Sequence, residues 1–307
     1  MADQIVEITQ TGHALGKVRG FLEVRGEGKT LGKVPLDDIL AIIIAVPGCT
    51  ISTVLLDDLS QRSVPVVICG RNYLPTTLLL PVLGYGRQFQ VMRSQSRVSE
   101  PRRKRAWQAI VRGKIRNQAT VLERAGQNAT RLNRLAQQVK SGDPDNCEAQ
   151  AARDYWPRLF GPTFRRDRSA PGLNRALNYT YAIVRACVAR GISAAGLHPS
   201  FSLHHRHPQN PLNLVDDVLE PFRPLADYYL YHHGAARWQE ELQAEDKAVL
   251  SAITILPVPL AQESSPLSLA AVRVARSLAA YSMGESDELL LPQLPDPLDM
   301  AGYGNPA

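Results

Sequence analysis

Short apolar runs separated by turn-forming residues characterise residues 1–85 of the chain. Such runs are typical of β-strands, and the continuous apolar run within residues 36–46 indicates a strand buried on both faces. Residues 53–61 instead have apolar positions at helical spacing. The pattern therefore predicts a β-rich unit with one short helix and with strands at residues 5–8, 14–18, 21–25, 29–33, 36–46 and 64–69.

The pattern changes beyond residues 74–86, a segment rich in proline and glycine that predicts a linker. From residue 88 onward glycine becomes sparse, and residues that favour helices increase. Apolar positions then recur at helical spacing in residues 107–139, 147–156, 173–190 and 265–283. We predict an α+β fold, in which an N-terminal β-sandwich-like domain (1–86) precedes a larger all-helical domain (88–286). Residues 287–307 lack periodicity and contain four prolines, so they are predicted as a mobile C-terminal tail.

The composition is that of a globular protein, with 307 residues, 44% hydrophobic and 21% charged. No apolar run reaches the roughly 18 residues that span a membrane, and the first residues lack the pattern of a signal peptide. The four cysteines form no C-x-x-C pair, which indicates reduced core thiols instead of a zinc site or a disulfide framework. We therefore expect a cytoplasmic protein without a membrane partner.

The net charge of +6 hides a strong asymmetry along the chain. Residues 91–140 contain 13 basic and 2 acidic side chains, whereas residues 207–307 contain 5 basic and 14 acidic ones. A concentrated positive charge suits the phosphate backbone of a nucleic acid. A solvated helical face is the alternative, but such faces usually mix both signs. The charge pattern therefore favours a nucleic-acid partner.

Residues 203–224 combine histidines with carboxylates that a helix would bring together. Asp217 and Glu220 are three positions apart and therefore share a helix face. Imidazole and carboxylate groups together can hold a divalent metal, which polarises phosphate oxygens. Without a second contributing segment, the histidines at 204, 205 and 207 are most simply explained as a polar loop. Glu148, early in another helix, is likewise explained as an acid that stabilises the helix dipole.

Three segments together resemble a known family. They are C-E-A-Q-A-A-R-D-Y-W (147–156), G-L-N-R-A-L-N-Y-T-Y-A (172–182) and L-H-H…N-L-V-D-D-V-L-E-P-F-R-P (203–224). In order and spacing they resemble the signature segments of the CRISPR-associated protein 1 family, the DNA integrases of CRISPR adaptation. The D-D-x-x-E-P-F-R-P ending resembles the branch found in type II systems.

The resemblance implies a metal centre that binds Mg²⁺ or Mn²⁺. Matched residue by residue, it places the catalytic metal ligands at Glu148, His205 and Glu220. The family motif G-I-H-H reads S-L-H-H in this chain, which leaves His204 as the alternative to His205. Asp217 is the second choice to Glu220, because the family has an acidic residue at each of these two positions.

The resemblance also implies an activity and an assembly. The expected enzyme is a metal-dependent DNA integrase and endonuclease, which inserts short DNA fragments as new spacers at the repeat array through attack by 3′-hydroxyls. Its expected partners are double-stranded DNA with 3′ ends, CRISPR repeat DNA, a second copy paired through the N-terminal domains, and a small ferredoxin-like protein. Two such dimers would be bridged by one partner dimer. The alternatives are a metal-dependent nuclease for the repair of branched DNA and a DNA-binding scaffold without catalysis.

Two groups of side chains are candidates for direct DNA contact. The basic candidates are Arg102, Arg103, Lys104, Arg105, Arg165, Arg166 and Arg168, with ordinary surface charge as the alternative. The aromatic candidates are Tyr155 and Trp156, which would either stack on a splayed base or pack in the core.

Overall fold

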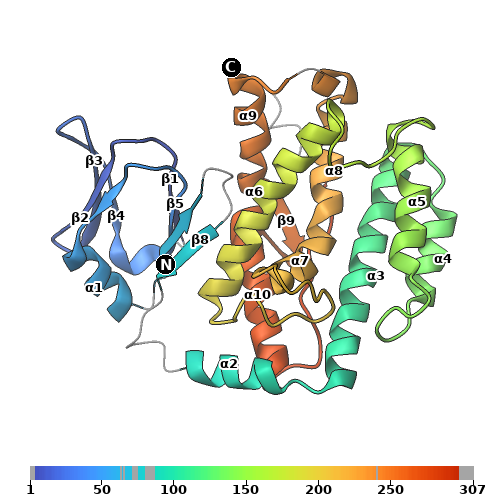
Figure 1. The fold of residues 1–307 in the computed structure, drawn as a ribbon, viewed down its shortest axis with the longest axis horizontal. Coiled ribbons are helices and arrows are strands. Elements are labelled where there is room, and N and C mark those ends of the chain that lie inside the picture. The colour runs from blue at the N-terminus through green and yellow to red at the C-terminus, as the bar shows by residue number, and fades with distance from the viewer. Residues whose placement is uncertain are drawn as a thin grey trace.

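The computed structural model describes residues 4–62, 64, 66–70, 75–79, 87–239 and 241–296. A β-rich part formed by the N-terminal strands lies beside a larger, mainly helical part (Figure 1). Helices α6 (Leu173–Ala194) and α10 (Leu267–Met283) stand between the β-rich part and the group formed by α3 (Glu100–Arg124), α4 (Thr130–Gln138) and α5 (Cys147–Phe160). The α+β fold with N-terminal strands that the sequence predicts is therefore confirmed.

The β-rich part consists of two four-stranded sheets. The first has the order β1 (Gln4–Ile8), β5 (Ile39–Ile44), β7 (Val66–Cys69) and β8 (Pro75–Leu79), in which β8 alone is antiparallel to its neighbour. The second has the order β4 (Lys29–Pro35), β3 (Phe21–Gly26), β2 (Ala14–Val18) and β6 (Thr50–Ile51). A short 3-10 helix, η1 (Leu36–Asp38), precedes β5, and helix α1 (Thr53–Gln61) follows β6.

Both sheets contribute to one apolar cluster. Leu15 and Leu22 come from the second sheet, Ile42 comes from the first, and Leu55 and Leu59 come from α1. This shared core explains why the strands read as apolar runs in the sequence. Strand β8 lies inside the segment predicted as a linker, and that prediction is wrong for residues 75–79, because they pair with β7. The remainder of that segment, residue 74 and residues 80–86, lies outside the described residues.

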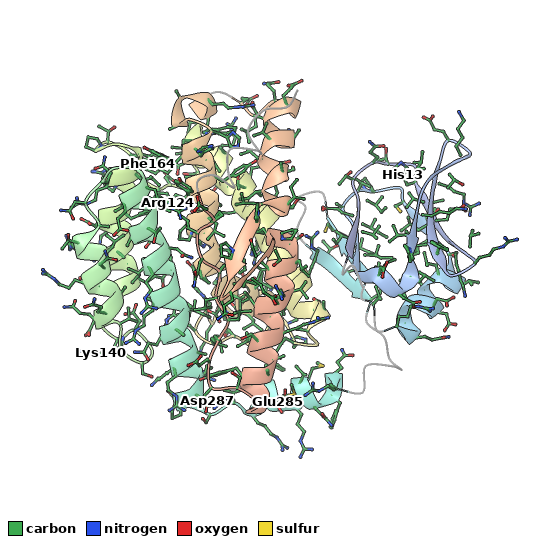
Figure 2. The ribbon with its side chains drawn as sticks, turned by 180° about the vertical axis from the view of Figure 1, so that it is seen from behind. His13, Arg124, Lys140, Phe164, Glu285 and Asp287 are labelled. Carbon is green, nitrogen blue, oxygen red and sulfur yellow. The ribbon has the colours of Figure 1, made fainter. Side chains whose placement is uncertain are left out.

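The helical part begins with α2 (Gln88–Arg97) and is built on α3, whose buried face carries the apolar stripe predicted from the sequence. Between α6 and α10 lie α7 (Asn213–Leu219), η2 (Glu220–Phe222), α8 (Arg223–His232), η3 (Ala235–Gln239), α9 (Ala244–Ser251) and η4 (Ala252–Ile255). Figure 2 shows the molecule from behind, with His13 in the β-rich part and Lys140 and Phe164 on the opposite side of the molecule. Among the described residues, no helix is both long and apolar enough to cross a lipid bilayer.

The helical part is not all-helical. Strands β9 (Pro257–Leu260) and β10 (Glu263–Pro266) form an antiparallel hairpin between η4 and α10. The segment P-V-P-L supplies two prolines, which cannot occupy a helix interior without loss of hydrogen bonds. The sequence prediction therefore identified the helix that follows the hairpin but missed the hairpin itself and the helices α9 and η4 before it.

The predicted mobile tail is packed as far as residue 296. Leu294 is buried, and the backbone N–H of Leu290 donates to Oγ of Ser277 at 2.7 Å. Nδ2 of Asn117 in α3 donates to the carbonyls of both Pro221 and Pro292 at 2.9 Å. The prolines that suggested mobility instead stiffen an extended segment whose leucines complete the core. The prediction is wrong for residues 287–296, and residues 297–307 lie outside the described part of the chain.

Gly191 allows the close approach of two buried helices, because a Cβ at this position of α6 would lie 2.6 Å from the carbonyl oxygen of Ala271 in α10. We expect Gly191→Ala to lower the free energy of unfolding by about 2 kcal/mol, since backbone must shift to relieve the clash. This loss outweighs the roughly 1 kcal/mol by which alanine favours a helix over glycine. Urea and thermal unfolding measure the change.

Gly113→Ala in α3 is the matched control for this substitution. Its added Cβ would have as its nearest neighbour Cδ1 of Leu291, at 3.0 Å, and that side chain can rotate away. Equal stability of the two variants would contradict the importance of the contact between α6 and α10.

Candidate active site

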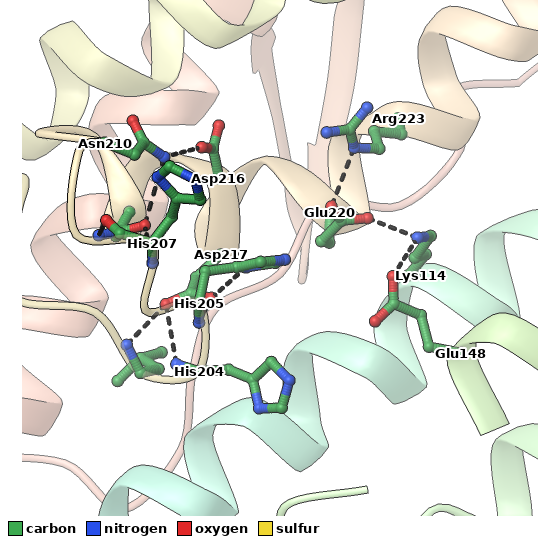
Figure 3. Close-up of polar contacts among 12 residues, drawn as sticks. Lys114, Glu148, His204, His205, His207, Asn210, Asp216, Asp217, Glu220 and Arg223 are labelled. Atoms are coloured by element: carbon green, nitrogen blue, oxygen red, sulfur yellow. Dashed lines mark hydrogen bonds and ion pairs between the residues drawn. The ribbon is translucent and has the colours of Figure 1, made fainter. Parts of the chain in front are cut away.

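A lysine on the buried face of α3 lies between two glutamates from other elements. The side chain of Lys114 is 9% exposed, and its Nζ lies 2.6 Å from Oε1 of Glu148 and 2.5 Å from Oε2 of Glu220. Figure 3 shows the ammonium group between the two carboxylates. Burial alone would lower the pKa of Lys114, but the carboxylates of Glu220 and Glu148 raise it above its ordinary value. One shared cation therefore holds together two carboxylates that are distant in the sequence.

Glu148 stands in the first turn of α5, where neighbouring side chains fix the start of the helix. Asn146 has a left-handed backbone at φ 50°, and its side chain accepts a hydrogen bond from a backbone N–H of the first turn. The carboxylate of Asp143 accepts hydrogen bonds from the N–H groups of Cys147 at 2.9 Å and Glu148 at 3.1 Å. Because these contacts serve the backbone, the Glu148 side chain is left to reach Lys114. At 24% exposure, it is the more accessible of the two glutamates.

Glu220 begins η2 directly after α7 and is almost fully buried. Its Oε1 accepts a hydrogen bond from Nε of Arg223 at 3.0 Å, while Oε2 contacts Lys114. Arg223 in turn lies over the ring of Tyr181, 4.8 Å from its centroid. Burial alone would raise the pKa of Glu220, but the positive charges of Arg223 and Lys114 lower it to about 2. Glu220 is therefore ionised at neutral pH.

Asp217 organises the loop that contains the histidines. It is fully buried in α7, and its Oδ2 accepts hydrogen bonds from the N–H groups of Leu203 and His204 at 2.6 and 3.0 Å. Its Oδ1 accepts from the backbone N–H of His205 at 3.0 Å and from Nδ1 of the same residue at 2.7 Å. Both oxygens are thus occupied by the loop. The geometry gives Asp217 the role of orienting His205 instead of the ligand role that was its second-choice assignment.

His205 presents its second ring nitrogen toward the glutamates. With Nδ1 held by Asp217, Nε2 is the nitrogen available for a further partner. In Figure 3 the ring lies between Asp217 and the cluster formed by Glu148, Lys114 and Glu220. The hydrogen bond with Asp217 raises the pKa of His205 against the opposing effect of burial, and the charges of Glu220 and Glu148 add to the increase.

The neighbouring histidine has a different environment. The ring of His204 stacks on Trp107 of α3, with centroids 4.3 Å apart and planes within 2°. The same indole contacts His205 edge-on at 5.6 Å. The backbone N–H of His207 donates to the side chain of Asn213, which fixes the end of the loop. The geometry therefore favours His205 over His204 as the histidine that faces the carboxylates.

The donor set of two carboxylates and one imidazole suits Mn²⁺ and tolerates Mg²⁺. Within the described residues, no three His, Cys, Asp or Glu side chains already form a cluster that could enclose a metal ion. The ammonium of Lys114 instead lies between Glu148 and Glu220, in the position that a cation would take. The two carboxylates already bind a positive charge at this position. The residues therefore fit a divalent metal.

The basic candidates differ in what they contact. Arg103, Lys104, Arg105 and Arg168 lie at least partly at the surface, although Lys104 pairs with Glu100. Arg102 contacts Asp287 and the carbonyls of Tyr281 and Ser286, so it anchors the C-terminal segment. Arg165 donates to carbonyls of its own loop, and Arg166 donates to the side chains of Asn174 and Asn178. Three of the seven candidates thus serve local structure.

Tyr155 packs in the core and does not offer a stacking platform. It is fully buried, and its hydroxyl donates to Asp227 at 3.1 Å. The hydroxyl of Tyr181 contacts the other carboxylate oxygen of Asp227. Trp156 is half-buried among Phe160 and neighbouring rings. Of the two explanations for these aromatic residues, the structure supports core packing.

Asp227 makes the stability of the fold depend on pH. Burial raises its pKa to about 7, although the hydroxyls of Tyr181 and Tyr155 act in the opposite direction. Because the folded state binds the proton more tightly than the unfolded chain, the protonated carboxyl stabilises the fold. This stabilisation is complete below the pKa of the unfolded chain, near 4, and is lost as the pH rises through the folded-state pKa of about 7. The full change is on the order of 4 kcal/mol. We expect Asp227→Asn to remove this dependence, which urea unfolding of both proteins at pH 5 and pH 8 measures. Parallel pH profiles of the two proteins would contradict this account.

Most of the chain matches the model of a known family. The model of the family described as CRISPR associated protein Cas1 matches residues 6–246. The chain belongs to this family. It is 38% identical to the CRISPR-associated endonuclease Cas1 of Neisseria meningitidis serogroup C (strain 8013) over 295 residues, which cover 94% of this chain and 95% of the relative. The resemblance inferred from the three sequence segments is confirmed.

Solved structures support the same fold. A casposase bound to its integration product superposes with a TM-score of 0.64 at 19% identity and covers 93% of this chain and 97% of its own. A chain from a partial Cas6-RT-Cas1–Cas2 complex superposes with a TM-score of 0.68 at 17% identity, with coverage of 93% and 97%. The arrangement of N-terminal strands and C-terminal helices is therefore the fold of these proteins.

Sequence reasoning missed three residues of the site. Lys114 and Trp107 lie on α3, outside the three segments that resemble the Cas1 family, and Lys114 was counted with the basic surface. Its position on the apolar stripe, three residues after Val111, was the available signal. Arg223 lies inside the third segment, three residues after Glu220, where helical spacing brings opposite charges together.

Proposed function

We propose that the protein is a metal-dependent DNA integrase and endonuclease of CRISPR adaptation. The observation that carries the proposal is the convergence of Glu148 and Glu220 on one cation beside His205. Glu148, Glu220 and Nε2 of His205 would hold Mg²⁺ or Mn²⁺. Such a metal, when bound, lowers the pKa of an attacking 3′-hydroxyl and offsets charge on the phosphodiester.

The surrounding residues keep these three ligands ready for that reaction. Asp217 holds Nδ1 of His205, which leaves Nε2 directed away from the loop. Arg223 and Lys114 keep Glu220 ionised in a buried position. The reaction joins a DNA 3′-hydroxyl to a phosphodiester at the repeat boundary and releases the 3′-hydroxyl of the cut strand. With water as the attacking group, the same site cleaves DNA.

A basic groove beside the site supports DNA as the substrate. It has a volume of about 910 Å³ and lies between α3 and residues 287–294. Arg105, Arg112 and Arg116 line it from one face of α3. Asn117, in the next turn, is hydrogen-bonded to Pro221, which directly follows Glu220. Contacts between these arginines and several phosphates would make DNA binding steeply dependent on salt. The surface candidates Arg103, Lys104 and Arg168 extend the proposed interface.

The proposed assembly follows from the family. The β-rich region (1–86) would pair two copies of the chain, and the helical region (88–286) would carry catalysis. A small ferredoxin-like protein would bridge two such dimers through its own dimer. The structural similarity to a chain of a Cas6-RT-Cas1–Cas2 complex supports a partner protein of the Cas2 kind.

Strand transfer separates this function from its alternatives. The purified protein, with and without its small partner, is incubated with a labelled DNA fragment, a supercoiled plasmid that carries the repeat, and Mn²⁺ or Mg²⁺. The proposal predicts label joined to the plasmid, and no joining when the fragment ends in a 3′-dideoxynucleotide. Degradation without joining would identify a repair nuclease. DNA binding without either product would identify a scaffold.

A further inference from the structure

The charges of the two glutamates are balanced by their ion pairs before any metal is added. Glu148 and Glu220 supply two negative charges, and Lys114 and Arg223 supply two positive ones. Three of these four side chains are no more than 20% exposed, so water screens their charges weakly. A divalent ion added to this arrangement would leave an uncompensated positive charge in a largely buried place, which is costly.

The two cations are not equivalent. Lys114 contacts a carboxylate oxygen of Glu148 and another of Glu220, so its ammonium links the two proposed ligands. Arg223 contacts Glu220 alone, through Oε1, and is held over the ring of Tyr181. A metal shared by both glutamates therefore competes with Lys114, whereas the contact between Arg223 and Oε1 can persist.

We propose that Lys114 is the internal cation of the metal-free site, and that a divalent metal binds by displacing its ammonium from between Glu148 and Glu220. This inference rests on the proposed metal-dependent function. Lys114 is a positioning residue, because it acts through the two glutamates. Its lysine stem has four methylene groups with free rotation, which allow the ammonium to withdraw while α3 stays fixed. An arginine with its planar guanidinium would be harder to move.

The displacement has two consequences with opposite sign. Lys114 stabilises the metal-free protein, because without it two carboxylates would face each other in a poorly solvated place. Lys114 also weakens metal binding, because part of the binding free energy is spent on moving the ammonium. Metal binding is therefore coupled to movement of the Lys114 side chain at the centre of the site.

The test compares Mn²⁺ binding by isothermal titration calorimetry in wild-type protein and in Lys114→Met, which keeps the apolar stem and removes the charge. We expect the variant to bind Mn²⁺ roughly tenfold more tightly, because the competing charge is gone. Its unfolding midpoint without metal should be lower than that of the wild type, and Mn²⁺ should raise it more. Lys140→Met is the matched control, because Lys140 is a surface lysine that pairs with Asp145 (Figure 2).

The outcomes distinguish this inference from the proposed function. Glu148→Gln reports on the metal site itself, and its loss of Mn²⁺ binding supports the function. If Lys114→Met then binds Mn²⁺ with equal or lower affinity than the wild type, the displacement is refuted and the function stands. If Mn²⁺ binds to the variant alone, the ammonium is not displaced in the wild-type protein and the inference is refuted. If neither protein binds Mn²⁺, both proposals fail.

A crystal structure of the wild-type protein with Mn²⁺ tests the displacement without any substitution, which matters if Lys114→Met does not fold. We expect Nζ of Lys114 to lie beyond hydrogen-bonding distance of at least one of the two glutamates. Nζ still bonded to both while Mn²⁺ is coordinated by Glu148 and Glu220 would overturn the inference.

Discussion

Glu148→Gln is expected to abolish strand transfer while the protein stays folded. The amide has the shape of the carboxylate but lacks its charge, so the metal loses a ligand and the shared cation loses half of its countercharge. We expect joining of labelled DNA to fall by roughly 10³-fold. Because Glu148 is the more exposed of the two glutamates, its substitution should disturb stability less than Glu220→Gln. Joining measured with Mn²⁺ at saturating DNA concentration gives the size of the effect.

Glu220→Gln should lose activity to a similar extent and should also lose stability. It leaves Arg223 and Lys114 buried without their common partner, and breaking such a pair typically costs about 3–5 kcal/mol. Glu100→Gln, an exposed position on α3 that pairs with Lys104, is the control for a change of surface charge. Strand transfer that survives Glu148→Gln would remove the carboxylate from the reaction and with it the proposed centre.

The second large effect separates two adjacent histidines. We expect His205→Ala to lower strand transfer by roughly 10²-fold or more, because it removes the imidazole that Asp217 orients toward the glutamates. His204→Ala should change activity by no more than a few-fold, since that ring stacks on Trp107 and its loss costs about 1 kcal/mol of packing. Both variants differ from the wild type by one ring in the same loop, so each is the matched control of the other.

One result of comparing the His204 and His205 variants would contradict the assignment of His205. Loss of joining in His204→Ala, with activity retained in His205→Ala, would shift the metal ligand by one position along the loop. Far-ultraviolet circular dichroism and unfolding midpoints of both variants separate a chemical effect from an unfolded loop.

Where the sequence prediction succeeded, local pattern and tertiary packing agree. The helix at residues 173–190 could be predicted because its apolar residues recur at helical spacing. The same residues are buried in the structure, where this helix packs against α10. The hairpin at residues 257–266 was missed because its few residues carry prolines, which are read locally as loop. The segment 287–296 was missed for a different reason. Its order depends on partners such as Asn117 and Ser277, which are distant in the sequence.

The site shows the same division. Spacing predicted that Asp217 and Glu220 share a helix face, but Asp217 lies in α7 and contacts the loop of His205, whereas Glu220 begins η2 and contacts Lys114. The identity of the ligands came from the family resemblance, because no local pattern connects Glu148 to residues near 220. Lys114 was counted with the basic segment, although its position on the apolar stripe of α3 indicated a buried side chain.

The wide separation of the contacting residues has a consequence for the order of folding. Lys114 meets Glu148 across 34 positions and Glu220 across 106 positions. Contacts between residues so far apart in the sequence form late in folding. The entropy cost of closing a long loop must be met before the contact contributes any stability. A chain still emerging from the ribosome therefore holds α3 and α5 without the third segment of the site. A fragment that ends before residue 220 therefore lacks one of the two carboxylates that Lys114 holds together.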